Sequence, residues 1–258
     1  MNEAGLSGGS LLDRVDLRIA QRIAGLDRGA EHEMLQAAHL YHDRLFRPSS
    51  QDPMFMAALL RLRGFTVQDA DAVEVLDGSS RRLMPASQEG QLLFGLVDVL
   101  QMIRDRASQG RPPDGWFLVE LFKTMTRGLP RFRNQALRVD QPWDGMLYVA
   151  HPRPSELTSV LDRFDYGNRY RDNPALFDQL HPLRQGFRLL WRFARIAPFP
   201  DLNLPMAWLA MASWLLCRGY PMLVPETGDR ELLPRFVAAP PPTRVVQWEA
   251  RFLKAIGG

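Results

Sequence analysis

Apolar residues recur at helical spacing in many segments of this chain, and this periodicity restricts the fold more than any other feature of the sequence. The clearest segment begins at Ser87 and ends at Gly110. Its apolar residues lie three or four positions apart and include Leu92, Leu96 and Ile103. Ser87 is a favourable N-cap residue, and Gly110 is a favourable helix stop. The same spacing predicts further helices over residues 11–26, 31–46, 53–62, 113–126, 154–164, 174–195, 205–218 and 243–256. The chain is therefore predicted to be all-α.

Two stretches lack helical periodicity. Residues 129–151 contain Pro130 and Pro142, which interrupt helices, and the alternating tetrapeptide MLYV, which favours a short β-hairpin. This hairpin is the only β-structure that the sequence indicates. Residues 69–82 are rich in turn-forming residues, so we expect an irregular segment there.

Composition and charge exclude several classes of protein. The 258 residues are 46% hydrophobic, too apolar for a disordered chain and sufficient for a packed core. The 32 basic and 29 acidic residues leave a net charge of +3, too small for nucleic-acid binding by bulk charge. The single cysteine, Cys217, excludes an intramolecular disulfide and a cysteine metal cluster.

Membrane insertion and secretion are not expected either. The longest apolar run, residues 208–217, has about half the ~20 residues that span a bilayer. The first ten residues include the acidic Glu3 and lack a basic flank to a long apolar stretch, so a secretion signal is not recognised. We therefore expect a cytoplasmic protein without a membrane span.

One loop between two expected helices carries a recognisable motif. Residues 195–208, RIAPFPDLNLPMAW, resemble the signature H-P-F-x-D-G-N-G-R-x-x-R of Fic (Fido) domains at the same spacing. Four positions match the signature: Pro198, Phe199, Asp201 and Asn203. Five positions depart from it: Ala197 in place of histidine, Leu202 and Leu204 in place of the glycines, and Pro205 and Trp208 in place of the arginines.

The resemblance extends in order over residues 83–220. The segment GLPRFRN, with Arg133, resembles a turn of the family, and MLYVAHPRPSEL, with Tyr148, resembles its β-hairpin flap. Glu89 stands where many members have an inhibitory glutamate. The resemblance implies a Fic-type helical bundle with one short hairpin flap, with an N-terminal helical extension over residues 1–82 and the Fic-like domain over 83–258. In the family, the flap pairs with an extended segment of the target protein.

The substitutions in the motif bear on the reaction that the resemblance implies. In the family, the motif histidine takes a proton from a target hydroxyl, which then attacks the α-phosphate of ATP; alanine at Ala197 has no titratable group. The family glycines turn backbone amides toward the phosphates, whereas Leu202 and Leu204 are not expected to adopt positive φ readily. We therefore expect no transfer of AMP. Asp201 would correspond to the magnesium ligand of the family, but we do not expect magnesium or a nucleotide to bind here as they do in the family.

The site residues follow from the same register. Asp201 is the candidate catalytic residue if any chemistry remains. The candidate ligand-binding or target-binding residues are Asn203, Phe199, Trp208, Arg133, Tyr148, Arg195 and Glu89. A structural role competes with this interpretation, because Asn203 is a good N-cap for the following helix and Phe199 could fill the core.

Three other groups of residues allow a functional interpretation. His32, His39 and His42 could share one face of a helix and hold a metal, or they could be ordinary surface and packing residues. Four arginines at helical spacing precede the motif, and they could bind a phosphate or pair with neighbouring acids: Arg184, Arg188, Arg192 and Arg195. His151, expected to be exposed, could act as a displaced base.

Three hypotheses of function remain open. The first is a binding pseudoenzyme that takes a protein segment or small molecule at the flap and the remodelled cleft. The second is an enzyme that acts on a less charged or non-nucleotide substrate. The third is an inactive toxin relative or an antitoxin-like partner that binds another protein through its N-terminal helices.

Overall fold

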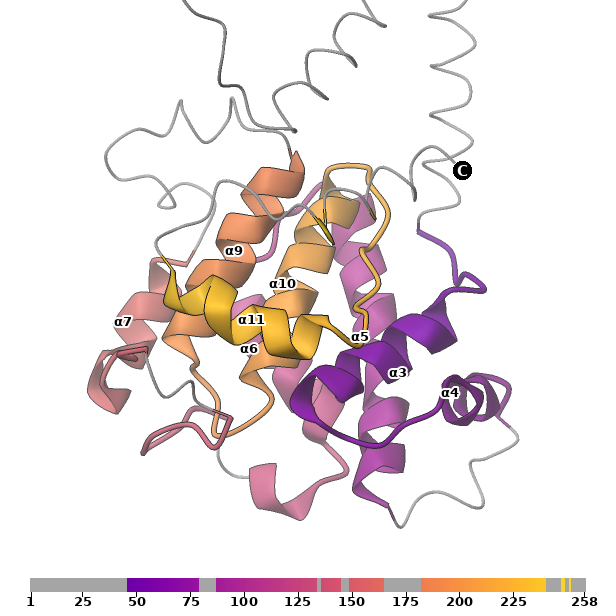
Figure 1. Cartoon of the computed structure of the whole chain (residues 1–258), viewed down its shortest axis with the longest axis horizontal. Helices are drawn as coiled ribbons and strands as arrows, with labels where there is room; N and C mark the ends of the chain where they lie inside the picture. Colours follow the sequence, from indigo (N-terminus) through magenta and orange to yellow (C-terminus); the bar gives the residue numbers. More distant parts are fainter. Residues whose placement is uncertain are drawn as a thin grey trace, which may run out of the picture.

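The computed structural model describes residues 46–78, 87–133, 136–144, 149–164, 182–239, 247, 248 and 251 (Figure 1). Several predictions lie outside these residues. They are the helices over 11–26 and most of 31–46, the three N-terminal histidines, the tip of the hairpin with Tyr148, the first part of the helix over 174–195, and nearly all of the helix over 243–256.

The described residues form α-helices and short 3₁₀-helices, without a β-strand among them. In chain order the elements are α3 (Asp52–Arg63), α4 (Asp69–Leu76), α5 (Gln88–Ser108), α6 (Gly115–Thr126), η2 (Pro130–Phe132), η3 (Pro154–Glu156), α7 (Leu157–Asp162), α9 (Pro182–Ile196), α10 (Asn203–Cys217) and α11 (Asp229–Ala238). The all-α prediction is confirmed. Among the described segments, no helix is long and apolar enough to cross a membrane.

Helix α10 forms the centre of the bundle. All of its residues from Asn203 to Leu216 are buried, as expected of a helix that is apolar on every side. It packs chiefly against α9 and α5, and also against α3 and α6, while α11 lies against α9 and α3 (Figure 1). The start of α10 is therefore held among several elements, and this is the place where the motif lies.

Local capping explains where α5 and α6 begin. Ser87 caps α5, because its hydroxyl accepts the Gly90 N–H at 2.9 Å. Asp114 caps α6 by accepting the Phe117 N–H at 2.8 Å. Both helices were predicted, and their observed bounds lie within two residues of the expected ones.

The prediction of an irregular segment over 69–82 is wrong for its first half, which forms α4. The Asp71 carboxylate accepts the main-chain N–H of Gln68 at 2.8 Å and so stabilises the first turn. Ala72 and Val75 then bury one face of the helix. Glutamine is an uncommon N-cap residue, and this start signal was missed for that reason.

The end of α3 determines where its last side chain points. Gly64 ends the helix in the left-handed conformation, with φ of 103°. This conformation favours glycine, and a Cβ at this position would also lie 2.7 Å from the Arg230 guanidinium, which would have to move. Arg63 is therefore the last helical residue of α3, and its side chain reaches the motif.

Candidate functional site

The motif loop connects α9 to α10 through two residues in the left-handed region. Ala197 has φ of 43° and Leu202 has φ of 66°. The expectation that Leu202 would not readily take positive φ is wrong. Its side chain is fully buried, and this burial offsets the strain of about 1–2 kcal/mol for a non-glycine residue. Leu204 is an ordinary helical residue in the first turn of α10.

Asp201 is buried and ion-paired with an arginine from α3. Its side chain is only 3% exposed. The Nε of Arg63 donates to Oδ1, and Nη2 donates to Oδ2 at 3.3 Å. The hydrogen bond with Asp201 is the main reason why the pKa of Arg63 lies above its usual value, and the charges of Asp201 and Asp144 act in the same direction. Arg131 adds a second positive charge, with Nη2 at 3.5 Å from Oδ2.

Asp144 lies at the start of α10 and receives hydrogen bonds from it. Asn203 Nδ2 donates to Oδ1 at 2.7 Å, and the Leu204 N–H donates to Oδ2 at 3.3 Å. Burial raises the pKa of Asp144 to about 6, although its hydrogen bond from Asn203 acts in the opposite direction. Asp144 is thus the carboxylate that satisfies the N-terminus of α10.

Asn203 does not cap the helix that it begins, which corrects the N-cap interpretation. Leu202 is the N-cap residue, and Asn203 is the first residue of α10. The Asn203 side chain instead bonds across the preceding turn, where Oδ1 accepts the Phe199 N–H at 2.9 Å and Nδ2 donates to the Phe199 carbonyl at 2.9 Å. Asn203 therefore holds the loop closed and orients Asp144.

Arg138, which sequence reasoning missed, fixes the other side of the loop. It is only 2% exposed, and it donates to the carbonyls of Ala197 at 2.7 Å and Asp140 at 3.0 Å, and also to that of Pro152. Its main-chain N–H donates to the Pro198 carbonyl at 2.9 Å. Burial lowers its pKa from the usual arginine value. No sequence signal marked this arginine, because its partners are main-chain carbonyls.

Two of the predicted target-binding side chains are part of the core. Phe199 is fully buried and stacks on Phe122, with ring centroids 4.0 Å apart. Trp208 is also fully buried and donates its indole N–H to the Leu223 carbonyl at 2.7 Å. Neither side chain offers a surface to a ligand in this structure.

The other predicted site residues that the structure describes lie on or beside α9, η2 and α5. Arg195 donates to the Val237 carbonyl of α11 at 2.9 Å, and Arg192 donates to the Arg163 carbonyl at 3.0 Å. Both of these members of the arginine series therefore donate to main-chain oxygens. Arg133 is exposed beside η2, and Glu89 lies in the first turn of α5.

His151 is half-buried, which corrects the expectation that it is exposed. Its Nδ1 lies 2.9 Å from the Arg195 carbonyl, so Nδ1 carries the proton and donates. Burial is the main cause that lowers its pKa, so the ring is neutral near pH 7. Its Nε2 is shielded from solvent and has no partner among the described residues.

The residues present do not fit a magnesium-bound nucleotide in this arrangement. A hard divalent cation needs free carboxylate oxygens, but both oxygens of Asp201 face Arg63. Two amides of the loop are also engaged, because the Leu202 N–H donates to Asp201 at 2.7 Å and the Leu204 N–H donates to Asp144. An incoming phosphate would meet two carboxylates and no free amide at these positions.

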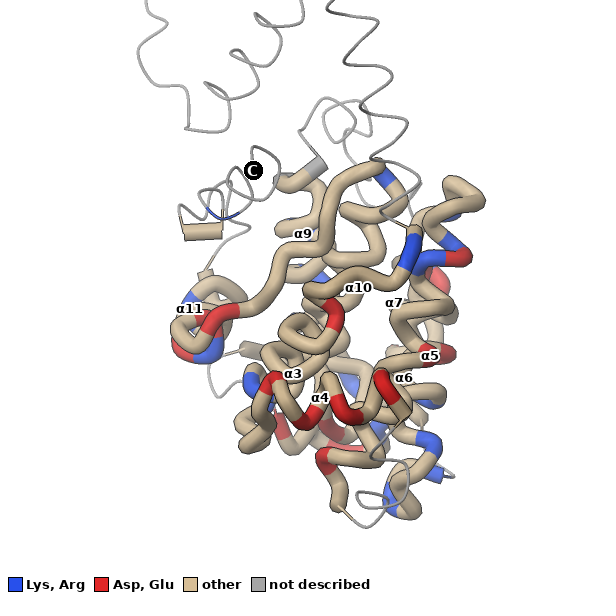
Figure 2. The backbone as a smooth tube through the Cα atoms, turned by 90° about the vertical axis from the view of Figure 1, so that its right-hand side faces the viewer, with Lys and Arg blue, Asp and Glu red and all other residues tan. Residues whose placement is uncertain are grey.

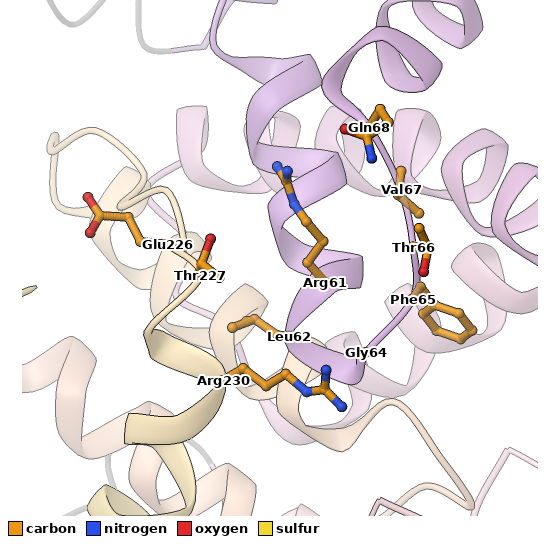
Figure 3. Close-up of a pocket in the computed structure, with 10 residues that line it drawn as sticks. All are labelled: Arg61, Leu62, Gly64, Phe65, Thr66, Val67, Gln68, Glu226, Thr227 and Arg230. Atoms are coloured by element: carbon orange, nitrogen blue, oxygen red, sulfur yellow. The ribbon is translucent and has the colours of Figure 1, made fainter.

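A separate hollow of about 260 Å³ lies between the end of α3 and the start of α11 (Figure 3). Its lining includes Arg61, Phe65, Glu226 and Arg230. Figure 3 shows the guanidinium groups of Arg61 and Arg230 pointing to different sides, and Arg61 is paired with Asp69 at 2.6 Å. The hollow is therefore distinct from the motif loop and lacks convergent donors.

Comparison with known proteins places the fold. No family sequence model matches the chain, and no curated protein sequence matches it. A Fic domain containing signalling protein from Bacteroides thetaiotaomicron is similar in structure, with 19% identity, a TM-score of 0.58, and coverage of 86% of this chain and 91% of that chain. Fic-1 from C. elegans also has a TM-score of 0.58, at 15% identity and coverage of 93% and 76% respectively. The chain therefore has the helical fold of Fic domains, as the motif predicted.

Proposed function

We propose that this protein is a degenerate Fic-fold protein that does not transfer AMP and that acts by binding a protein segment or small molecule beside the motif loop. The observation that carries this proposal is the pairing of Asp201 with Arg63. An internal arginine occupies the carboxylate that the motif resemblance assigns to a metal ion. The negative charge of Asp201 is thus balanced by Arg63 without an added cation.

The absence of a base at residue 197 supports the same proposal. General base catalysis contributes about 10²–10⁴-fold to the rate of such reactions, and Ala197 cannot supply it. The one histidine among the described residues, His151, has its protonated nitrogen bonded to the Arg195 carbonyl and its other nitrogen shielded from solvent. A target hydroxyl would have no proton acceptor at residue 197 or on this histidine.

The electrostatics of the loop oppose a triphosphate. Amides at a helix N-terminus attract an anion when they are free. Here Asp144 already accepts from Leu204, and Asn203 already accepts from Phe199. The carboxylate of Asp144 in addition places negative charge where a phosphate would approach. Loss of the base and loss of the anion site are independent, so restoring one would not restore the reaction.

A second candidate function is an enzyme with different chemistry, and one observation favours it. Asp144 has a pKa raised to about 6, the range in which a carboxyl can both take and release a proton near neutral pH. It is better suited to that role than Asp201, whose oxygens are engaged by Arg63. Loss of an activity in Asp144→Asn but not in Arg61→Ala would favour this candidate.

The proposed lack of AMP transfer can be tested directly. The full chain is incubated with ATP labelled on the α-phosphate, magnesium and a whole-cell protein extract, and the proteins are separated and imaged. We expect no transfer of label above a sample without the protein. Label that appears with the wild type and disappears with Asp201→Asn would overturn the proposal.

A further inference from the structure

Two large apolar side chains are exposed on the segment next to the motif loop. Trp143 is 60% exposed and Val139 is 65% exposed, and both belong to residues 136–144. Isolated apolar residues on a surface are common, but two exposed apolar residues within one short segment, one of them a tryptophan, mark an interaction site more often than a single one does. Neither residue carries a role in the loop chemistry described above.

The main chain of this segment is held in place. The Trp143 N–H donates to the Pro200 carbonyl at 2.7 Å, and the Arg138 N–H donates to the Pro198 carbonyl at 2.9 Å. The Arg138 side chain also donates to the Asp140 carbonyl at 3.0 Å. A partner that binds here meets an ordered backbone, so little conformational entropy is lost in ordering the segment.

Aromatic rings connect the exposed tryptophan to the core. Phe132 lies next to Trp143, with ring centroids 6.2 Å apart, and it is itself in edge contact with Phe122 at 5.4 Å. Phe122 stacks on Phe199 of the motif. Trp143 therefore projects from a packed aromatic series, and its indole is supported on one side while the other remains accessible.

One arginine lies beside the Trp143 ring, and a second follows it two residues later in the chain. The Arg131 guanidinium is 4.5 Å from the centroid of Phe132 and 5.4 Å from that of Trp143, and its side chain is 38% exposed. Arg133 is exposed, and its side chain makes no hydrogen bond or ion pair within the described parts of the chain. Asp140 is the exposed acid on the same segment. The exposed charges near Trp143 thus carry a net positive sign.

We propose that Trp143 and Val139, with Arg131 and Arg133 beside them, form a docking surface for an extended protein segment that carries a large apolar residue next to acidic residues. This proposal rests on the binding function proposed above, and it adds the chemical class of the partner. The indole and the Val139 side chain take the apolar residue. The guanidinium groups of Arg131 and Arg133 take the carboxylates, and Arg131 can do so while it remains stacked on the rings.

A single-stranded nucleic acid could also use an exposed tryptophan and arginines. The charge of the chain opposes this occupant, because the net charge is only +3. Figure 2 shows lysine and arginine positions spread over several elements. A protein segment is therefore the occupant that the observations favour, and nucleic acid is one outcome of the test.

The test selects ligands without assuming a partner. A displayed library of random twelve-residue peptides is panned on the full chain, and selected peptides are synthesised with a fluorophore for polarisation titrations. We expect the selected peptides to share an aromatic or aliphatic residue flanked by aspartate or glutamate. Their affinity should fall by about tenfold or more in Trp143→Ala and Val139→Asp, and several-fold in Arg133→Ala.

The matched control is Trp116→Ala. Trp116 is also exposed, at 44%, but it lies at the start of α6, at the end of that helix away from η2. This variant should bind the peptides as the wild type does. Circular dichroism spectra and melting temperatures establish that each variant is folded before its affinity is compared.

Several results would overturn the docking surface. They are a failure to select any peptide, selection of basic peptides, equal affinities for wild type and Trp143→Ala, and Trp143-dependent binding of a fluorescent oligothymidylate with no peptide bound. The AMP-transfer assay is independent of all of these, because it measures the transfer of label from ATP, and Trp143 and Val139 are unchanged in both proteins compared there. Failure of the docking surface and failure of the proposed lack of transfer are therefore distinguishable.

Discussion

Arg63, the last residue of α3, donates two hydrogen bonds to Asp201, which lies 138 residues later in the chain. This pair joins the N-terminal part of the described bundle to the loop before α10. A buried ion pair is a weak source of net stability, but removal of one partner leaves the other charge buried and uncompensated. The pair therefore determines both what the loop can bind and how the loop is held.

Arg63→Ala should destabilise the protein far more than the same change two residues earlier. We expect a loss of about 2–4 kcal/mol in the free energy of unfolding, because Asp201 stays buried without its main partner. The control is Arg61→Ala, whose pair with Asp69 is 38% and 50% exposed and should contribute about 0–1 kcal/mol. Urea denaturation measures both.

A double-mutant cycle isolates the interaction between the two residues. Arg63→Ala combined with Asp201→Asn should lose less stability than the sum of the two single changes, since the uncompensated charge is then absent. Equal losses in Arg63→Ala and Arg61→Ala, or strict additivity in the cycle, would contradict the structural role assigned to this pair.

The left-handed backbone of Leu202 predicts an unusual order of stability among its variants. Leu202→Ala and Leu202→Gly both lose a buried side chain, at a cost of about 2–5 kcal/mol. Glycine accepts φ of 66° without strain, so Leu202→Gly should be about 1 kcal/mol more stable than Leu202→Ala. Denaturant unfolding of the purified variants gives the two free energies.

Leu204 supplies the control for this comparison. It is buried and helical, so Leu204→Gly should be less stable than Leu204→Ala by about 0.5–1 kcal/mol. If Leu202→Gly were also the less stable of its pair, the left-handed conformation at Leu202 would be incorrect.

Arg138→Lys should weaken the loop although the charge is kept. A lysine is a point charge without the planar fork, so it cannot donate to the Ala197, Asp140 and Pro152 carbonyls together. Buried carbonyls left without donors predict a loss of about 2–3 kcal/mol. Hydrogen exchange at the Phe199 and Trp143 amides should accelerate as well.

Arg127→Lys is the matched exchange on the surface. Its pair with Asp98 has side chains 60% and 45% exposed, and the change should stay within about 0.5 kcal/mol. Comparable effects of the two substitutions would show that the hydrogen bonds of Arg138 do not stabilise the loop.

The raised pKa of Asp144 predicts a dependence of stability on pH. The folded state holds this proton up to a pKa of about 6, whereas the unfolded chain releases it near 3.8. The stabilisation from protonation is therefore complete below pH 3.8 and is lost as the pH rises through 6, by up to about 3 kcal/mol. The stability of wild type relative to Asp144→Asn should fall by this amount between pH 4 and pH 7.

Unfolding free energies of both proteins across this pH range provide the measurement, and the comparison cancels the titration of all other groups. A difference between wild type and Asp144→Asn that stays constant from pH 4 to pH 7 would place the pKa of Asp144 near its ordinary value.

The helices and the motif were predictable from sequence because their signals are local. Ser87 is a direct N-cap for α5, and the spacing of the residues around Asp201 and Asn203 identified the loop before α10. Helix α11 was missed because Pro234 lies inside it and interrupts the usual pattern. The fold class thus follows from periodicity and one short motif.

The contacts of the candidate site could not be predicted in the same way. Arg63 lies in an otherwise ordinary amphipathic helix, and nothing in the sequence links it to Asp201. Arg138 bonds to main-chain carbonyls, and because every residue has one, the sequence does not indicate these partners. Asn203 was predicted to cap the helix that follows it, although its side chain bonds to the preceding turn and to Asp144. Such partners are set by tertiary packing between segments far apart in the chain.

Titration calorimetry with magnesium and ATP tests the central claim most directly. In this account Arg63 is bonded to Asp201, and the amides of Leu202 and Leu204 are bonded within the loop. The wild-type chain should therefore show no saturable heat of binding at nucleotide concentrations up to the millimolar range. A saturable isotherm with a dissociation constant below about 1 mM, abolished by Asp201→Asn and unchanged by Arg61→Ala, would contradict the account and place a metal-bound nucleotide at Asp201.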